Sequence, residues 1–363
     1  MKIWIDARVH PQNQYYYSFI SQLIEQIFVY NTEHHFVIYI EKDWNIDIDI
    51  SKKIPDHISI KELTTKNLKT IWFFWKKKIF EKEKFHMMIF FDIHYVPHRY
   101  TRPYMLILES LKDIFFPKKK WLERKLFSYK LRRSIKHCYK YICLDSYSPL
   151  ELNEHLNIPE DNIGHIPWFF PKLENQCKNL EIDVKLKHNL EYPYLIYDSG
   201  NEVHNNFERI LKSIKKLKDM WHPIHLIITC DTTSWDIDIR EKVIEYNLMG
   251  NIIFLWTIEK KFESSYYKQS YGVIYSTIYE SFPFQFSKWI HYKKPLLAND
   301  IRTHKEIMGD SIVYLDPLSV HVMSDVLHAH TQQELWKVSS SYMSVIKKYN
   351  PKQTLDALFT YLE

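Results

Sequence analysis

Short apolar runs alternate with amphipathic stretches along the chain. In its first half we expect buried strands at residues 3–5, 36–40, 87–91, 105–108, 141–144 and 163–166. Apolar residues at helical spacing predict helices at 17–30, 121–138 and 149–156. Strands that alternate with helices in this way predict a parallel sheet with crossover connections.

The pattern is interrupted once and then begins again. Pro167, Pro171 and the polar stretch 174–188 predict an interdomain linker. Beyond it we expect strands at 194–197, 225–229, 252–255 and 273–275, and helices at 207–217, 240–246 and 262–269. The last stretch, 339–363, is predicted to be helical with a break at Pro351.

A chain of 363 residues is expected to form two domains. We therefore predict two Rossmann-like α/β domains, covering residues 1–172 and 173–345, followed by a terminal helix at 346–363. No apolar run reaches the roughly 18 residues that cross a bilayer. The first residues lack the pattern of a secretory signal, so we expect a cytoplasmic protein.

The four cysteines are Cys138, Cys143, Cys177 and Cys230. They form no C-x-x-C pair and lack the spacing of metal ligands. We expect reduced, buried thiols and no bound metal.

The segment 276–317 carries most of the chemical information. It predicts a strand, a short acidic turn, a helix, a strand, a loop and a strand, and Glu280 follows the apolar run 272–275. A carboxylate there lies at the carboxyl end of a buried strand, where open α/β sheets bind their ligands. The order of these pieces resembles the donor-binding segment of retaining glycosyltransferases with the GT-B fold, in particular glycosyltransferase family 4.

Two further stretches carry the same resemblance. Residues 143–163 are similar to the family's strand, polar turn, helix and IPEDKI run, and residues 194–206 to its donor loop. The resemblance implies two Rossmann-like domains facing each other across a cleft, the first for the acceptor and the second for the nucleotide-sugar donor. It also implies that the C-terminal helix crosses back to the first domain.

The implied activity belongs to bacterial polysaccharide biosynthesis. A hexose would move, with retention, from a nucleotide diphosphate sugar to a cell-surface glycan or lipid-linked acceptor, without a metal or other cofactor. The alternative is a catalytically inactive GT-B homologue that acts as a binding or scaffold partner, because two elements of the family's donor site are replaced here.

The first replaced element lies in the donor loop. Ser199 and Gly200 precede a helix expected to start near Asn206. N–H groups at a helix N-terminus favour phosphate, and glycine permits close approach; a glycine that serves only a tight turn is the alternative. The resemblance implies an Arg-Lys pair that grips the diphosphate, and His204 and Asn205 stand in its place. Asn205 carries no charge, and His204 carries one only when protonated.

The second lies after the acidic turn. Glu280 matches the first glutamate of the family's Glu-x7-Glu motif, which contacts the donor sugar near the reacting carbon. A carboxylate there orients hydroxyls and favours oxocarbenium character; a solvated turn glutamate is the alternative. Ser281 and Phe282 follow it and are expected to join the donor site. The second glutamate, implied to hold the ribose, is Lys288, which cannot accept hydroxyl hydrogen bonds.

The first domain offers two candidates. Glu109 stands where the resemblance places a His-Asp pair, and we predict a catalytic role as a proton or hydroxyl acceptor. It could equally cap a helix. His94 is predicted to line the acceptor cleft, with a structural histidine as the alternative.

The net charge of +5 is unevenly distributed. Residues 118–140 hold ten Lys or Arg against one acid, and residues 69–84 interleave aromatic and basic side chains. Such stretches suit the anionic inner face of a membrane, and we expect peripheral contact there. A solvated helix face is the alternative. Nucleic-acid binding is not expected, because no recognised module surrounds these residues.

Glycine is scarce and tryptophan abundant. The chain has only 5 glycines and 11 tryptophans, whereas about 7% glycine is typical. Tryptophan stands where turns or the resembled family favour glycine at Trp4, Trp44, Trp221, Trp235 and Trp256. Two explanations stay open: an AT-rich genome with genuine tryptophans, or a lineage that reads UGA as glycine where the translation writes tryptophan. The second would also put Trp289 in question.

Overall fold

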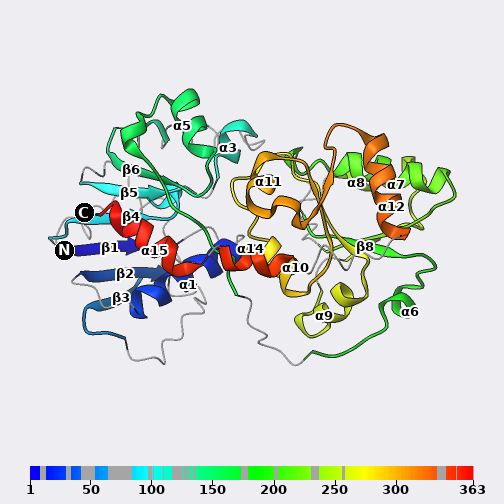
Figure 1. The fold of residues 1–363 in the computed structure, drawn as a ribbon, viewed down its shortest axis with the longest axis horizontal. Coiled ribbons are helices and arrows are strands. Elements are labelled where there is room, and N and C mark those ends of the chain that lie inside the picture. Colours follow the sequence, from blue (N-terminus) through cyan, green and yellow to red (C-terminus); the bar gives the residue numbers. More distant parts are fainter. Residues whose placement is uncertain are drawn as a thin grey trace. The chain divides into compact units, whose positions relative to one another are not determined.

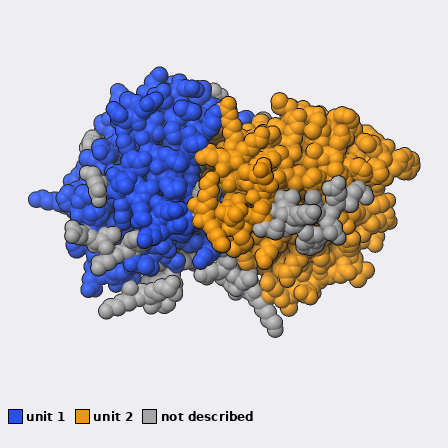
Figure 2. Space-filling view, viewed as in Figure 1, with its two compact units in different colours: residues 1–172, 349–363 blue, residues 173–348 orange. Residues whose placement is uncertain are grey.

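The protein, described by a computed structural model, consists of two compact units (Figures 1 and 2). The first comprises Met1–Lys172 and Tyr349–Glu363, and the second comprises Leu173–Lys348. The residues that the structure describes are 1–8, 14–29, 34–41, 54–63, 84–96, 100, 102–108, 110–116, 125, 129, 131–133, 136–172, 179–199, 203–229, 237–255, 258–332, 341–348 and 350–362.

The first unit is built on a seven-stranded parallel sheet of order β3-β2-β1-β4-β5-β6-β7. The strand order reverses direction between β1 and β4, which is the doubly wound arrangement of Rossmann-like domains. The strands are β1 (Lys2–Asp6), β2 (His35–Glu41), β3 (Ile58–Leu63), β4 (Met87–Phe90), β5 (Tyr104–Ile107), β6 (Cys138–Cys143) and β7 (Ile163–His165). The described helices are α1 (Gln14–Val29), η1 (Ile93–Tyr95), α3 (Lys112–Phe115), α5 (Ser148–Leu156), η2 (Glu160–Asn162) and α15 (Pro351–Thr360).

The second unit repeats this plan with a six-stranded parallel sheet of order β10-β9-β8-β11-β12-β13. Its strands are β8 (Tyr194–Tyr197), β9 (His225–Ile228), β10 (Ile252–Phe254), β11 (Gly272–Tyr275), β12 (Leu296–Asn299) and β13 (Val313–Leu315). Its described helices are α6 (Val184–His188), η3 (Val203–Asn205), α7 (Phe207–Asp219), α8 (Ile237–Glu245), α9 (Lys260–Gln269), α10 (Phe286–His291), α11 (Arg302–Met308), η5 (Gly309–Ser311), α12 (Val320–Gln332) and α14 (Tyr342–Lys348). Here the order reverses between β8 and β11.

Packing of the α7 helix against the second sheet holds the neighbouring loop in place. Its apolar residues fall on one face, where Ile210, Leu211 and Ile214 are fully buried in a core shared with β8, β9 and α12. On the other face, the Lys212 ammonium lies 2.8 Å from the Glu208 carboxylate, one turn away. The buried face sets α7 against the sheet, so the loop before Phe207 is held at the carboxyl end of β8.

The terminal helix α15 belongs to the first unit. The Asn350 side chain accepts a hydrogen bond from the Gln353 N–H at 3.0 Å and caps the helix, with Pro351 in its first turn. The Thr354 hydroxyl donates to the Pro167 carbonyl at 2.7 Å, and α15 packs beside α1 (Figure 1). The predicted return of the C-terminal helix is confirmed, and the break expected at Pro351 separates α14 from α15.

Several elements were not predicted. The edge strand β3 was missed, because ISIKEL mixes apolar and charged positions. The predicted linker was wrong at its end, where Asp183 caps α6 by accepting from the Leu186 N–H at 2.9 Å. The predicted loop before the last strand of the segment 276–317 contains α11, and α12 also went unpredicted.

Two predictions from composition can be examined in part. Cys138 and Cys143 are free, buried thiols, as expected. Burial raises the pKa of Cys138 to about 12, so this thiol is inert near neutral pH. Cys177 and Cys230 lie outside the described residues. Within the described part of the chain, no helix has the length and apolar character needed to cross a lipid bilayer.

Candidate functional site

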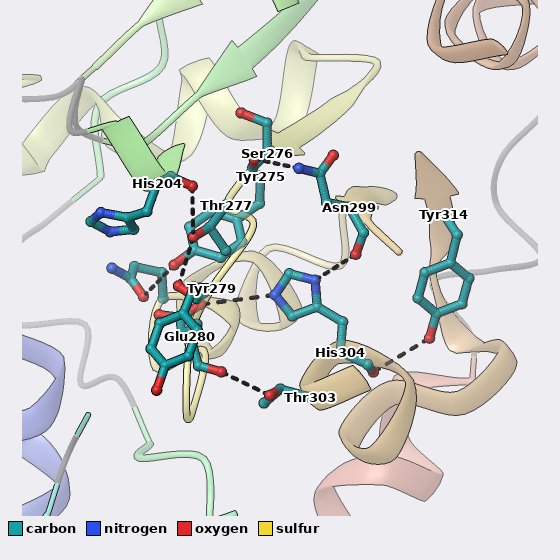
Figure 3. Close-up of polar contacts among 11 residues, drawn as sticks. His204, Tyr275, Ser276, Thr277, Tyr279, Glu280, Asn299, Thr303, His304 and Tyr314 are labelled. Atoms are coloured by element: carbon teal, nitrogen blue, oxygen red, sulfur yellow. Dashed lines mark hydrogen bonds and ion pairs between the residues drawn. The ribbon is translucent and has the colours of Figure 1, made fainter. Parts of the chain in front are cut away.

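The candidate site lies at the reversal of strand order in the second unit. The loops after β8 and β11 both start at the carboxyl ends of adjacent strands, which is where open α/β sheets bind ligands. Hydrogen bonds join these loops: the Ile278 N–H donates to the His204 carbonyl at 2.7 Å, and the Ser276 hydroxyl donates to the Asn205 carbonyl. The Thr277 hydroxyl also donates to the His204 carbonyl at 3.3 Å (Figure 3).

Glu280 lies in the loop after β11. The Thr303 hydroxyl donates to the Glu280 carbonyl at 2.7 Å, which ties this loop to α11 (Figure 3). The Glu280 side chain is 17% exposed, and its Oε2 lies 3.8 Å from Nε2 of His304. Burial raises the pKa of Tyr275 well above its usual value, and the neighbouring Glu280 carboxylate adds to this effect. Glu280 is therefore a mostly buried carboxylate at the ligand-binding edge of the sheet.

His304 is fully buried beside it. The Nδ1 atom of His304 lies 2.8 Å from the carbonyl oxygen of Asn299. Because a carbonyl only accepts, Nδ1 carries a proton and donates it. The Asn299 amide in turn donates to the Ser276 carbonyl. The imidazole is thus held between Asn299 and Glu280 (Figure 3).

Four residues of the predicted donor loop are buried. Ser199, His204, Asn205 and Asn206 each expose 6–8% of their surface. Within the described residues, the Ser199 hydroxyl is buried without a hydrogen-bond partner. Asn206 precedes α7 with φ of +55°, and its side chain accepts from Arg209 at 2.7 Å. Gly200 lies outside the described residues.

Lys288 on α10 occupies a dense charge cluster. Its ammonium lies 2.6 Å from a carboxylate oxygen of Glu263 on α9 and 3.0 Å from one of Asp198 after β8. Asp198 also accepts hydrogen bonds from the Tyr267 hydroxyl at 2.7 Å and the Thr229 hydroxyl at 2.9 Å. Burial alone would raise the pKa of Asp198, but Lys288 and these hydrogen bonds more than offset it, and the pKa is lowered.

The sequence similarity of this chain to known proteins is low. No protein-family model matches the chain. It is 21% identical over 213 residues to the O-antigen chain mannosyltransferase RfbU of Salmonella typhimurium, a match that covers 58% of this chain and 56% of that protein. The chain thus spans about half the length of this curated relative.

Solved structures match over the whole chain. The sucrose-phosphate synthase of Thermosynechococcus elongatus has a TM-score of 0.68 at 11% identity, covering 100% of this chain and 98% of that one. HepE of Anabaena, solved in complex with UDP-glucose, has a TM-score of 0.68 at 10% identity, covering 100% and 99%. The chain has the GT-B fold.

In this GT-B chain, several predicted donor-site residues come together. Glu280, His204 and Asn205 lie in the two joined loops described above. Ser281 and Phe282 follow Glu280 and are buried, and the Phe282 ring packs 5.0 Å from that of Phe284. Their burial indicates that this part of the loop is fixed by packing.

The structure does not describe the side chains of the two candidate residues in the first unit. Glu109 lies outside the described residues. His94 lies in η1, which follows β4.

Sequence reasoning missed Asp198, Glu263, Thr303 and His304. Asp198 directly precedes Ser199, so its position at the end of a strand was an available signal. The other three act through contacts between distant segments, which no local pattern reveals. Within the described residues, no cluster of three or more His, Cys, Asp or Glu side chains could hold a metal ion.

Proposed function

We propose that this chain is a retaining glycosyltransferase that moves a hexose from a nucleotide diphosphate sugar to a glycan or lipid-linked acceptor. The observation that carries the proposal is the Glu280 carboxylate, mostly buried at the switch point between β8 and β11. The names of similar proteins support it, since they include an O-antigen chain mannosyltransferase and a structure with UDP-glucose.

Two features would serve the donor. The N–H groups that begin α7, a helix of 13 residues, point toward the carboxyl end of β8 and suit a diphosphate. Arg209 brings a guanidinium to the same helix start, where the expected Arg-Lys pair is absent. Fixed dipoles and a cation of this kind stabilise a departing diphosphate, so the proposed reaction proceeds without a metal or cofactor.

Glu280 would act on the sugar itself. A carboxylate beside the reacting carbon orients hydroxyl groups and stabilises positive charge on the ring as the bond to the diphosphate breaks. Its burial strengthens this effect, because electrostatic interactions are stronger where water is excluded.

A second candidate function is a GT-B scaffold without catalytic activity. Lys288 favours it, because its ammonium replaces a ribose-binding carboxylate and is itself engaged by Asp198 and Glu263. In this reading the site is a folded remnant whose charges are mutually neutralised.

Donor hydrolysis distinguishes the two functions. The full chain is incubated with a panel of nucleotide sugars, and hydrolysis and thermal shift are recorded for wild type, Glu280→Gln and Glu241→Gln. Glu241 is an exposed residue of α8 and serves as the matched control. The transferase predicts hydrolysis that falls by about 100-fold in Glu280→Gln only, with the thermal shift retained. A wild type that hydrolyses no donor and shows no shift would favour the scaffold.

We further propose peripheral contact with the anionic inner face of a membrane through residues 69–84 and 118–140. Neutralising Lys118–Lys120 should weaken binding to vesicles that contain anionic lipid, because each basic residue near the surface contributes about 1 kcal/mol. Equal binding of variant and wild type, or none by either, would contradict this contact.

A further inference from the structure

The buried pair formed by Glu280 and His304 carries an inference that rests on the proposed function. The Nδ1–H of His304 is engaged by the Asn299 carbonyl at 2.8 Å, so Nε2 is the ring atom that faces Glu280 (Figure 3). Nε2 and the facing Oε2 of Glu280 are 3.8 Å apart. Within the described residues, both atoms are buried without a hydrogen-bond partner.

Such a pair calls for an explanation, because buried polar atoms are almost always hydrogen-bonded. The ring cannot turn away without breaking its bond to Asn299, which is itself bonded to the Ser276 carbonyl. The imidazole ring also packs against the rings of Phe286 and Tyr275, whose centroids lie 5.2 Å and 5.7 Å from its own. The imidazole is therefore fixed, while the carboxylate opposite it belongs to a loop.

We propose that His304 is a positioning residue for Glu280. A proton held between Nε2 of His304 and Oε2 of Glu280 joins the two atoms by a hydrogen bond as the loop brings them together, and this bond holds the carboxylate in one orientation. The other carboxylate oxygen is then directed at the donor sugar. No bond in the sugar is broken or formed by His304 itself.

Two amide variants separate this role from simple packing. His304→Asn places a donor near the position of Nδ1 but removes the atom that faces Glu280. His304→Gln places an amide near the position of Nε2 instead. His330→Asn is the matched control, because His330 also engages a carbonyl through Nδ1, that of Val326 at 2.9 Å, on α12.

We expect His304→Asn to lower kcat for donor hydrolysis by about 10- to 100-fold with little change in the donor KM, and His304→Gln to recover much of that loss. Unchanged kcat in His304→Asn would overturn the inference, as would equal losses in both amide variants, which indicate a packing role. An inactive wild type would instead contradict the proposed function, so the two failures are distinguishable.

A second inference comes from the end of α7 and is independent of the activity. The N–H of Trp221 donates to the Lys218 carbonyl at 3.1 Å, and that of His222 donates to the Leu217 carbonyl at 2.9 Å. This pair of bonds is the Schellman closure of a helix, whose left-handed residue is usually glycine. Trp221 holds that place with φ of +62°.

Tryptophan is poorly suited to this position, because its side chain is bulky. The other described non-glycine residues with positive φ are Asn157, Asn189, Asn206, Asn247 and Lys293. Asparagine adopts this conformation readily, whereas a bulky residue there is an outlier, and among the described residues Lys293 is the other long side chain in this group. The Trp221 side chain is also 90% exposed, so burial does not compensate. By contrast, Trp4 and Trp289 are fully buried and have negative φ, so their backbone conformation does not favour glycine.

We infer that position 221 is glycine in the cell, encoded by a UGA codon that the translation writes as tryptophan. The scarcity of glycine, 5 residues against 11 tryptophans, agrees with this. Trp44, Trp235 and Trp256 lie outside the described residues, so the inference stands on Trp221 alone.

The gene and the native protein decide the matter. A UGA codon at position 221, with glycine in the corresponding peptide by mass spectrometry of the source cells, is the expected result. A UGG codon, or tryptophan in that peptide, would overturn the inference. In the recombinant chain, Trp221→Gly should raise Tm by about 2 °C, whereas Met220→Gly next to it, at φ of −86°, should not. Equal effects of these substitutions would contradict the backbone argument.

Discussion

At the scale of single residues, the Lys288 ammonium balances the negative charge of two carboxylates near the loop after β8. Its side chain is 13% exposed, and its ammonium lies between the carboxylates of Glu263 and Asp198. Lys288→Met leaves these carboxylates facing each other, so we expect a loss of about 3 kcal/mol in unfolding free energy, measured by urea denaturation. Adding Glu263→Gln should restore part of it. Lys261→Met is the control, since its exposed pair with Glu259 should contribute less than about 1 kcal/mol.

The pH dependence of this loss has a definite sign. The pKa of Asp198 in the folded protein is below its ordinary value of 3.8. A lowered folded pKa gives stability that is present at neutral pH and is lost as the pH falls through the folded value. The difference in unfolding free energy between wild type and Lys288→Met should therefore be largest near pH 7 and shrink as the pH falls below 3.8. A difference that grows on acidification would contradict this assignment.

What the sequence could predict at this scale follows from how local each feature is. Glu280 was found because it directly follows a buried apolar run. The partners of Lys288 were not, because Asp198 lies 90 residues away in the chain and only the sheet brings them together. His304 was missed for a related reason, since the seven residues of α11 are too few to show a helical period.

At the scale of elements, caps and buried faces decide where helices begin. Asn350→Ala removes the side-chain acceptor for the Gln353 N–H. We expect a loss of about 1 kcal/mol, seen as faster hydrogen exchange in α15. Asn350→Asp should retain the cap and serves as the control. If both variants exchange alike, the cap is not what holds this helix start.

The elements that the sequence predicted correctly are those with a strong period or a continuous apolar run. The fully buried strands β8, β11 and β12 fall within this group, as does the amphipathic α7. The edge strand β3 and the short helix α6 were missed, because partial exposure and shortness weaken the pattern. Glu109 and most of 118–140, on which the first-unit and membrane predictions rest, lie outside the described residues.

At the scale of the whole molecule, the sequence predicted two α/β halves because the alternation of strand and helix stops and restarts. It did not predict how the loops of the second half bind one another, since the bonds from Ser276 to Asn205 and from Thr303 to Glu280 join separate segments. The residues of the candidate site that these bonds join all lie in the second unit, Leu173–Lys348.

This confinement can be tested on the full chain by hydrogen exchange with a nucleoside diphosphate. If the site binds the diphosphate at α7, amides at the start of α7 should become protected, because the bound phosphate accepts their hydrogen bonds. Amides in the loop after β11 should also become protected, because hydrogen bonds join this loop to the loop before α7. At 100 times the dissociation constant, binding should stabilise the second unit by about 2.7 kcal/mol. Adding the sugar moiety should extend protection to Glu280 and Thr303. Protection confined to residues of the first unit would place the nucleotide elsewhere.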